Sequence, residues 1–200
     1  RQYFYALQKY NSILSQRNNL LKNEDRELIY ETLPFWDVKL CEYASIIIYE
    51  RDAFIKKLMP ICSEVHAFLT DGEVISLSSE SAFSGSVQEI QSQMIDALKE
   101  RYEKDIVLGY TTIGPHRDDI KIKVNDKDVK VYGSQGQQRT AVLCLKLAEG
   151  ELSKELTGEY PVFLLATCCG MRLGEYSAIT INDIDFINGK INICKQYTQR

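Results

Sequence analysis

Residues 133–140 read Gly-Ser-Gln-Gly-Gln-Gln-Arg-Thr, between a strand-like run at 129–132 and a strongly helical run at 139–156. The first turn of a helix exposes unpaired N–H groups and partial positive charge, so this composition suits a loop that contacts phosphate. Ser134 and Gln137 also have the spacing of a capping box. Taken alone, the stretch therefore fits a phosphate-contacting loop and an ordinary well-capped helix equally well.

Arg139 favours the phosphate interpretation. We expect Arg139 in the first turn of the helix, where the helix dipole disfavours a positive charge. A nearby anion would remove that penalty, so we include Arg139 among the candidate contacts.

The chain upstream of this loop is largely helical in pattern. Apolar residues recur at helical spacing over 3–22, 35–69 and 87–104, and a charged connection at 23–32 is followed by Pro34. The first two predicted helices, joined by that short connection, indicate an antiparallel arm. Strands are expected at 74–77, 109–113 and 120–124, the last paired with 129–131 in a hairpin. These patterns predict a mixed α/β fold.

Composition narrows the function classes. The chain has 200 residues, of which 44% are hydrophobic and 26% charged, with a formal net charge of −4. This composition is typical of a soluble globular protein, and any contact with DNA has to come from a local basic patch. No run of 18 apolar residues and no signal peptide are evident, so we expect no membrane partner. Because the sequence begins with Arg1, we expect a fragment.

Cysteine and histidine usage argues against a metal site. The six cysteines have no C-x-x-C spacing, and the two histidines, His66 and His116, lie far apart in the sequence. We interpret the cysteines as reduced intracellular thiols and expect no bound metal.

Three stretches, in this order and spacing, resemble the RecF family of DNA replication and repair proteins. The first contains Ser15-Gln16-Arg17-Asn18 and, later, Trp36-Asp37. The second is Ile113-Gly114-Pro115-His116-Arg117-Asp118-Asp119. The third runs from Tyr132 to Thr140 and continues into Leu145-Lys146-Leu147-Ala148-Glu149. The resemblance covers roughly residues 1–165.

The resemblance implies a cytoplasmic protein of DNA repair, replication and the SOS response. It implies a helical arm at 1–104 and part of an ABC-type ATPase lobe at 105–165. RecF-like proteins bind ATP, dimerise around it, bind single-stranded or gapped DNA and work with other recombination mediators. The signature loop of such ATPases contacts ATP held by the partner copy. By resemblance its residues here are Ser134, Gln135, Gly136 and Gln137, with Arg139 beside them.

The sequence departs from this family pattern at two places. No G-x-x-x-x-G-K-[ST] phosphate-binding loop occurs, and Leu164-Leu165 is followed by Ala166-Thr167 where the family has paired aspartates. Those aspartates would supply the Mg²⁺ ligand and the activating carboxylate. ATP and Mg²⁺ are therefore expected for the intact family, with no complete site in this chain, which we expect not to hydrolyse ATP alone.

A polar corner formed by His116, Arg117, Asp118 and Asp119 is the second candidate site. A histidine with two carboxylates suits acid–base chemistry, and the family resemblance suggests a corner near nucleotide or DNA. The alternative is a Pro-anchored turn that leads into the strand at Ile120.

The last part of the chain resembles a different family. Thr167 to Glu175 and the Asn188-Gly189 turn resemble the opening of a tyrosine recombinase catalytic domain, which would imply DNA integration. By resemblance, Arg172 would clamp the scissile phosphate as a catalytic residue. Two alternatives to a RecF-like protein follow: a recombinase fragment covering 166–200, and a non-catalytic hybrid of the two families. We expect this segment to be a short helix-hairpin.

Overall fold

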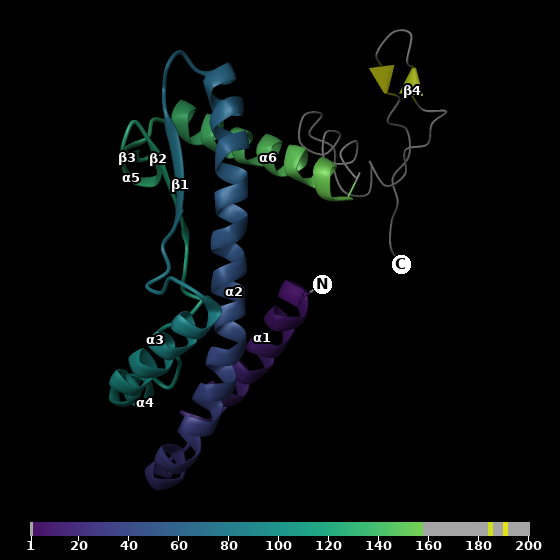
Figure 1. Cartoon of the computed structure of the whole chain (residues 1–200). Coiled ribbons are helices and arrows are strands. Elements are labelled where there is room, and N and C mark those ends of the chain that lie inside the picture. Colours follow the sequence, from purple (N-terminus) through teal and green to yellow (C-terminus); the bar gives the residue numbers. More distant parts are fainter. Residues whose placement is uncertain (1, 158–183, 186–189, 192–200) are drawn as a thin grey trace. The chain divides into compact units, whose positions relative to one another are not determined.

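A computed structural model describes residues 2–157, 184–185 and 190–191 of the chain (Figure 1). The mixed α/β class is confirmed, and the fold is rich in helix with small antiparallel sheets. The helices are α1 (Gln2–Leu20), α2 (Arg26–Leu69), α3 (Val87–Glu100), α4 (Tyr102–Leu108), α5 (Val129–Tyr132) and α6 (Gln135–Thr157). The strands are β1 (Ile75–Ser79), β2 (Ile120–Val124), β3 (Lys127–Asp128), β4 (Ile184–Asp185) and β5 (Lys190–Ile191).

The chain divides into two compact units, each assembled from separate stretches of sequence. The first unit contains residues 1–56 and 77–121, and the second contains 57–76 and 122–200. Helix α2 and strands β1 and β2 contribute residues to both. Each candidate site described below lies within a single unit.

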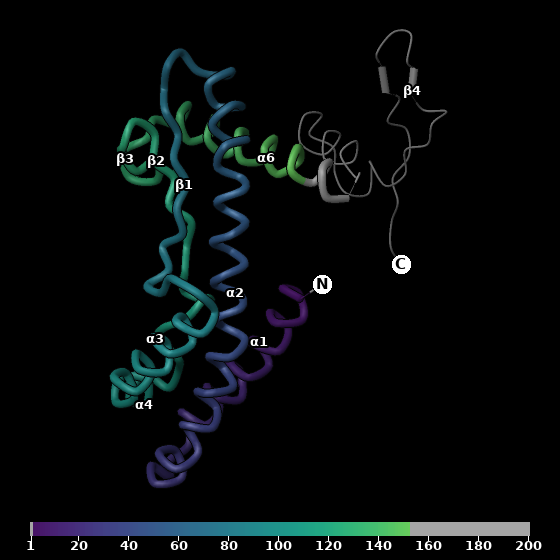
Figure 2. Tube along the Cα trace, in the orientation of Figure 1, coloured from purple at the N-terminus to yellow at the C-terminus, as the bar shows by residue number. Residues whose placement is uncertain are grey.

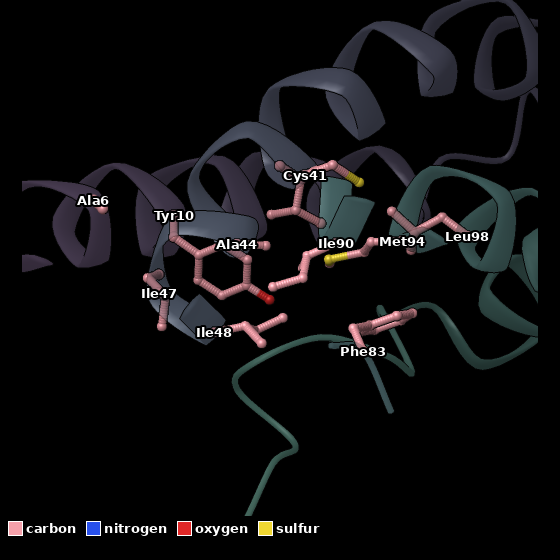
Figure 3. Close-up of a cluster of buried hydrophobic side chains, with 11 residues drawn as sticks. Ala6, Tyr10, Cys41, Ala44, Ile47, Ile48, Phe83, Ile90, Met94 and Leu98 are labelled. Carbon is pink, nitrogen blue, oxygen red and sulfur yellow. The ribbon is translucent and has the colours of Figure 1, made fainter. Parts of the chain in front are cut away.

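An apolar core holds the first unit together. Ala6 and Tyr10 of α1 pack with the segment of α2 that contains Leu40, Ala44 and Ile48. Three buried residues of α3 belong to the same cluster: Ile90, Met94 and Leu98. Figure 3 draws these side chains together with the Tyr10 ring and Phe83.

The arm formed by α1 and α2 is antiparallel, as predicted. Leu21, directly after α1, packs against Ile29 and Leu33 near the start of α2, whereas Ala6 packs farther along α2. Contacts between residues close to the connection and between residues far from it are the pattern of a helical hairpin. Figure 2 traces α1 beside this part of α2.

The boundary predicted for α2 is wrong. The helix begins at Arg26, inside the stretch predicted as a connection, and it continues through Pro34. Asp25 caps its start by accepting a hydrogen bond from Leu28 N–H at 3.1 Å. Proline in a helix interior costs about 3 kcal/mol. Burial of Ile29 and Leu33 on the same helix offsets that cost, and the exposed Pro34 lies away from this contact.

The β2–β3 hairpin turns within the loop predicted at 125–127, but Lys127 already belongs to the partner strand, and that strand differs from the prediction. Val124 pairs with Lys127, which leaves Asn125 and Asp126 as the loop with φ angles of 50° and 64°. Positive φ at both positions defines the type I′ turn, which asparagine and aspartate tolerate. Residues 129–131, predicted as a strand, form α5 instead. The Asp128 carboxylate accepts a hydrogen bond from Lys130 N–H at 2.8 Å and starts a helical turn.

Two further predictions need correction. The helix predicted at 87–104 is divided at Arg101 into α3 and α4, and Gly109 ends α4 with a φ of 72°. Residues 109–113 form no strand, because the N–H groups of Thr111 and Thr112 donate to the side chains of Asn18 and Asp105. Side-chain acceptors thus replace the neighbouring strand that a β-ladder would need.

Little of the last segment falls within the described residues. β4 pairs with β5 antiparallel, as in the predicted hairpin, but the register differs: Asp185 lies opposite Lys190, where a two-residue Asn188-Gly189 turn would place Ile187. Asn188 and Gly189 themselves lie outside the described part of the chain. Arg172 also lies outside it. Among the helices that are described, none combines the length and hydropathy needed to cross a membrane.

Replacing Pro34 tests this account of α2. We expect Pro34→Ala to raise the free energy of unfolding by about 2 kcal/mol, because it restores a helix N–H, less the entropy that proline removes from the unfolded chain. Urea unfolding followed by circular dichroism measures the change. Val38→Ala, at a side chain 49% exposed on the same helix, is the control, with an expected change below about 0.5 kcal/mol. A destabilised Pro34→Ala variant would contradict the helix seen here.

Candidate functional site

The start of α6 is held by the predicted capping box. Ser134 Oγ accepts a hydrogen bond from Gln137 N–H at 3.2 Å, and Gln137 Oε1 accepts one from Ser134 N–H at 3.0 Å. The helix therefore begins at Gln135, earlier than predicted, and Arg139 follows the first turn instead of lying within it. The dipole argument for a nearby anion is weakened by this shift, because the dipole effect declines within the first turn.

Two glutamines of the loop are held by contacts within the second unit. Gln137 Nε2 donates to the Glu73 carboxylate at 2.7 Å. Gln138 Nε2 donates to the carbonyls of Val129 and Gly133, each at 3.2 Å. Both side chains thus fix the loop against its own unit. Gln137 is half-buried in this contact and poorly placed to meet a ligand, whereas Gln138 remains exposed.

The remaining loop residues face outward. The side chains of Ser134, Gln135 and Arg139 are exposed, and Gly136 is exposed between them. Within the described chain, the N–H groups of Gln135 and Gly136 have no recorded hydrogen bond, as expected at a helix start. Of the five predicted ATP contacts, four are therefore accessible, and Gln137 is the exception.

The structure explains why glycine occupies position 133 of the loop, but it does not explain the glycine at position 136. A Cβ on Gly133 would lie 2.5 Å from the Val129 carbonyl oxygen, so the fold itself requires glycine there. A Cβ on Gly136 would meet only Ser134 Oγ, at an ordinary 3.7 Å. Glycine in a helix costs up to about 1 kcal/mol relative to alanine. Nothing in the described chain explains why Gly136 carries that cost.

The second candidate, the corner at 116–119, is built around His116 in the first unit. His116 Nε2 lies 3.1 Å from the Thr111 carbonyl oxygen, and Nδ1 lies 2.6 Å from the Tyr10 hydroxyl. A carbonyl can only accept, so Nε2 carries the proton and the Tyr10 hydroxyl donates to Nδ1. Gly114, at a φ of 129°, is required beside this pair, because its Cβ would lie 2.6 Å from the Tyr10 oxygen.

Burial shapes the titration of this corner. Desolvation lowers the pKa of His116 from its ordinary 6.5, so the ring is neutral at pH 7. Desolvation also raises the pKa of Tyr10, which keeps its hydroxyl proton available to His116. The pKa of the half-buried Asp118 carboxyl is raised by desolvation and lowered in part by a hydrogen bond from Ser81. Arg117 is exposed and lies 5.1 Å from the centre of the Tyr110 ring.

A buried arginine supports the corner from behind. The fully buried Arg17 of α1 forms ion pairs with Asp37 of α2 at 2.7 Å and with Asp105 of α4 at 2.8 Å. Its Nη1 also donates to Thr111 Oγ1 at 2.8 Å. Arg17 therefore fixes Thr111, whose carbonyl in turn fixes His116.

Sequence reasoning missed this support as a site. In the sequence, Arg17 and Asp37 stand out only as parts of the motifs that resemble RecF, and no local pattern marks Asp105. A charged residue at an inward-facing helical position, as Arg17 is between Tyr10 and Leu21, is the signal that was available. His116 is thus held as a structural residue, while Arg117 and Asp119 of the same corner are exposed. The corner and the α6 loop lie in different units.

Comparison with known proteins supports the RecF resemblance. The chain is 47% identical over 169 residues to the DNA replication and repair protein RecF of Ruminiclostridium cellulolyticum, covering 82% of this chain and 45% of that protein. It is 46% identical over 174 residues to RecF of Halothermothrix orenii, covering 82% and 46%. The chain thus spans about half the length of the curated relatives it matches. No family model matches it.

Solved structures agree with the sequence comparison. A structure of the recombination mediator protein RecF-ATPrS in the RecFOR pathway is 35% identical, with a TM-score of 0.72, covering 78% of this chain and 43% of that one. The RecF-ATP structure is 36% identical, with a TM-score of 0.71 and the same coverage. The described fold is therefore part of the RecF ABC-ATPase-like fold.

The comparisons do not support the recombinase resemblance of the last segment. Roles in DNA integration and in the SOS response, and a recombinase or hybrid identity, are unsupported as well. The short Arg172 motif was too small a basis for that interpretation, and Arg172 lies outside the described residues.

Removing the Arg17 side chain tests the buried network. Arg17→Ala leaves the buried carboxylates of Asp37 and Asp105 without their cation, so we expect the free energy of unfolding to fall by about 3–5 kcal/mol. Lys56→Ala is the control, since Lys56 forms an exposed pair with Asp52 and little change is expected. Urea unfolding measures both. Equal stabilities of the two variants would refute the supporting role of Arg17.

His116 predicts a pH dependence with a definite sign. The folded pKa lies below the unfolded value, so the unfolded chain takes up the proton first as pH falls. The contribution of His116 to stability is complete above pH 6.5 and declines as pH falls through the folded pKa. We expect His116→Gln to flatten the dependence of unfolding free energy between about pH 7.5 and 5.5.

A titration of the ring by NMR measures the same property directly. It should place the His116 pKa below 6.5 in the folded chain. Tyr10→Phe removes the donor to Nδ1 and should raise the pKa. A His116 pKa above 6.5 in the unaltered chain would contradict the buried, neutral ring.

Proposed function

We propose that this chain forms part of a RecF-like DNA replication and repair protein in which the start of α6 contacts ATP held by a second copy. The similarity to proteins named RecF over 82% of the chain supports the family assignment. The fold similarity to a structure named RecF-ATP supports the ligand class. The contact residues proposed are Ser134, Gln135, Gly136 and Arg139, with Gln137 in the structural role described above.

The single observation that carries the proposal is Gly136. An alanine would fit the chain and strengthen the helix, so the glycine has no internal purpose among the described residues. A bare backbone lets a phosphate approach the free N–H groups of the first turn. The exposed Arg139 guanidinium, one turn farther along, adds a charge that suits the same ligand.

The wider activity extends this proposal. The RecF resemblance implies a phosphate-binding loop and Mg²⁺-binding carboxylates. Neither motif occurs in these 200 residues, so the proposal assigns both to parts of the relatives that this chain does not match. The proposal includes single-stranded or gapped DNA as the substrate, an ATP-dependent homodimer as the assembly and other recombination mediators as partners. It also includes a cytoplasmic location, with the arm at 1–104 and the partial ATPase lobe at 105–165.

Association with a relative tests the α6 contact. The chain, labelled with a fluorophore, is mixed with full-length RecF of R. cellulolyticum, and fluorescence anisotropy is measured with and without ATP and Mg²⁺. We expect association that depends on ATP. Gly136→Ala should weaken association about tenfold or more, equivalent to 1.4 kcal/mol, because the added methyl group blocks the phosphate approach.

Stability measurements separate this effect from misfolding. Gly136→Ala should raise the free energy of unfolding by about 0.5–1 kcal/mol, whereas Ser134→Ala should lower it by about 1 kcal/mol through loss of the cap. Both should weaken association, while Ser92→Ala, at an exposed position of α3, should leave it unchanged. Full association by the Gly136→Ala variant would overturn the proposed role of the α6 start. ATP hydrolysis by the chain alone would contradict the separate expectation that its ATP site is incomplete.

A further inference from the structure

The first unit contains a cleft that the proposed ATP contact does not use. Its volume is about 680 Å³, within the usual range of small-ligand pockets. Helix α2 supplies one wall with Glu50, Arg51 and Phe54, and Asp118 and Ile120 supply another. All of these residues belong to the same unit.

Negative charge predominates around the cleft. Glu50, Asp118 and Asp119 contribute three carboxylates, against one guanidinium from Arg51. Arg51 Nη1 donates to the Pro115 carbonyl at 2.6 Å and Nε donates to the Tyr3 hydroxyl at 3.1 Å. Its positive charge offsets the charge of Asp118 in part, so the carboxylates remain in excess. Phosphate groups, and therefore nucleic acid, are repelled by such a lining, whereas a cation is attracted.

The same cleft presents apolar surface. The side chains of Phe54 and Ile120 are 42% and 50% exposed, although both are large and hydrophobic. An inorganic cation would gain nothing from them. An arginine or lysine would, because its methylene stem covers apolar surface while its charged end reaches a carboxylate.

We propose that this cleft binds a segment of a protein partner that carries an arginine or lysine next to apolar residues. The cation contacts Asp118, with Glu50 contributing to the attraction, and the apolar residues pack on Phe54 and Ile120. Charge complementarity and the exposed apolar walls are the observations that select this occupant.

The environment of Asp118 fits this role. Desolvation raises the pKa of its carboxyl, and the hydrogen bond from Ser81 and the charge of Arg51 offset that rise only in part. A bound cation would supply that compensation and favour the ionised form. The cleft proposal does not depend on ATP, so it can stand or fail separately from the α6 contact.

Two matched tripeptides test the cleft: acetyl-Leu-Arg-Phe-amide and acetyl-Leu-Glu-Phe-amide. Each is titrated into the full chain, and NMR shifts of the Phe54 and Ile120 resonances are followed. We expect the arginine peptide alone to shift these resonances. Asp118→Asn should weaken its affinity about tenfold, equivalent to 1.4 kcal/mol, and Glu50→Gln should weaken it about threefold.

Asp96→Asn is the matched control, because Asp96 is an exposed carboxylate on α3 outside the cleft lining, and it should leave the affinity unchanged. NMR chemical shifts that stay near native outside the cleft establish that the Asp118→Asn variant is folded. The Glu50→Gln variant tests independently whether the cleft carboxylates contribute to the affinity. Equal binding of the glutamate peptide would overturn the proposal. Unchanged affinity of the arginine peptide for both cleft variants would also overturn it. So would an oligothymidine that shifts the Phe54 and Ile120 resonances and binds more tightly than the arginine peptide.

Discussion

The first unit depends on one buried guanidinium. Arg17 is inaccessible to solvent, and two carboxylates from different helices compensate its charge. A buried ion is costly unless every partner is placed with good geometry, so α1, α2 and α4 are each held to one register against the others. The hydrogen bond from Arg17 to Thr111 then extends this constraint to residues 109–119, which have no strand or helix of their own before β2.

Long-range contacts of this kind explain which predictions failed. Asp105 and Thr111 lie 88 and 94 residues from Arg17 in the sequence, so no local pattern shows that they meet. Residues 109–113 look β-like by composition, yet their N–H groups bond to side chains. Pro34 looks like a helix boundary, yet burial of the surrounding apolar residues carries α2 through it. In each case tertiary contacts outweigh a sound local preference.

Features governed by neighbouring residues were predictable. The Ser134–Gln137 capping box and the Asn125-Asp126 turn both follow from side chains acting within four residues of themselves. The candidate loop was therefore visible in the sequence, down to most of its exposed residues. The sequence does not show which of these residues has a structural role, because the contact of Gln137 with Glu73 joins residues 64 positions apart. Only the fold separates the residue that braces the loop from those that face outward.

The glycines show most clearly which positions are explained by contacts within the chain and which are not. At Gly114 the Tyr10 hydroxyl occupies the space a Cβ would need, and at Gly133 the Val129 carbonyl does so. Both residues are explained by the chain itself. Among the described residues, Gly136 has room for a side chain, and its helix would gain from one. This is the reason for the proposal that a ligand approaches Gly136 from outside. Local charge then sorts the possible ligands. The free N–H groups beside Gly136 favour an anion, while the carboxylates around Asp118 favour a cation. The two proposed ligands thus carry opposite charges. A modest net charge of −4 is compatible with both, because exposed charges are screened beyond about 10 Å and each surface is governed by its own neighbouring groups.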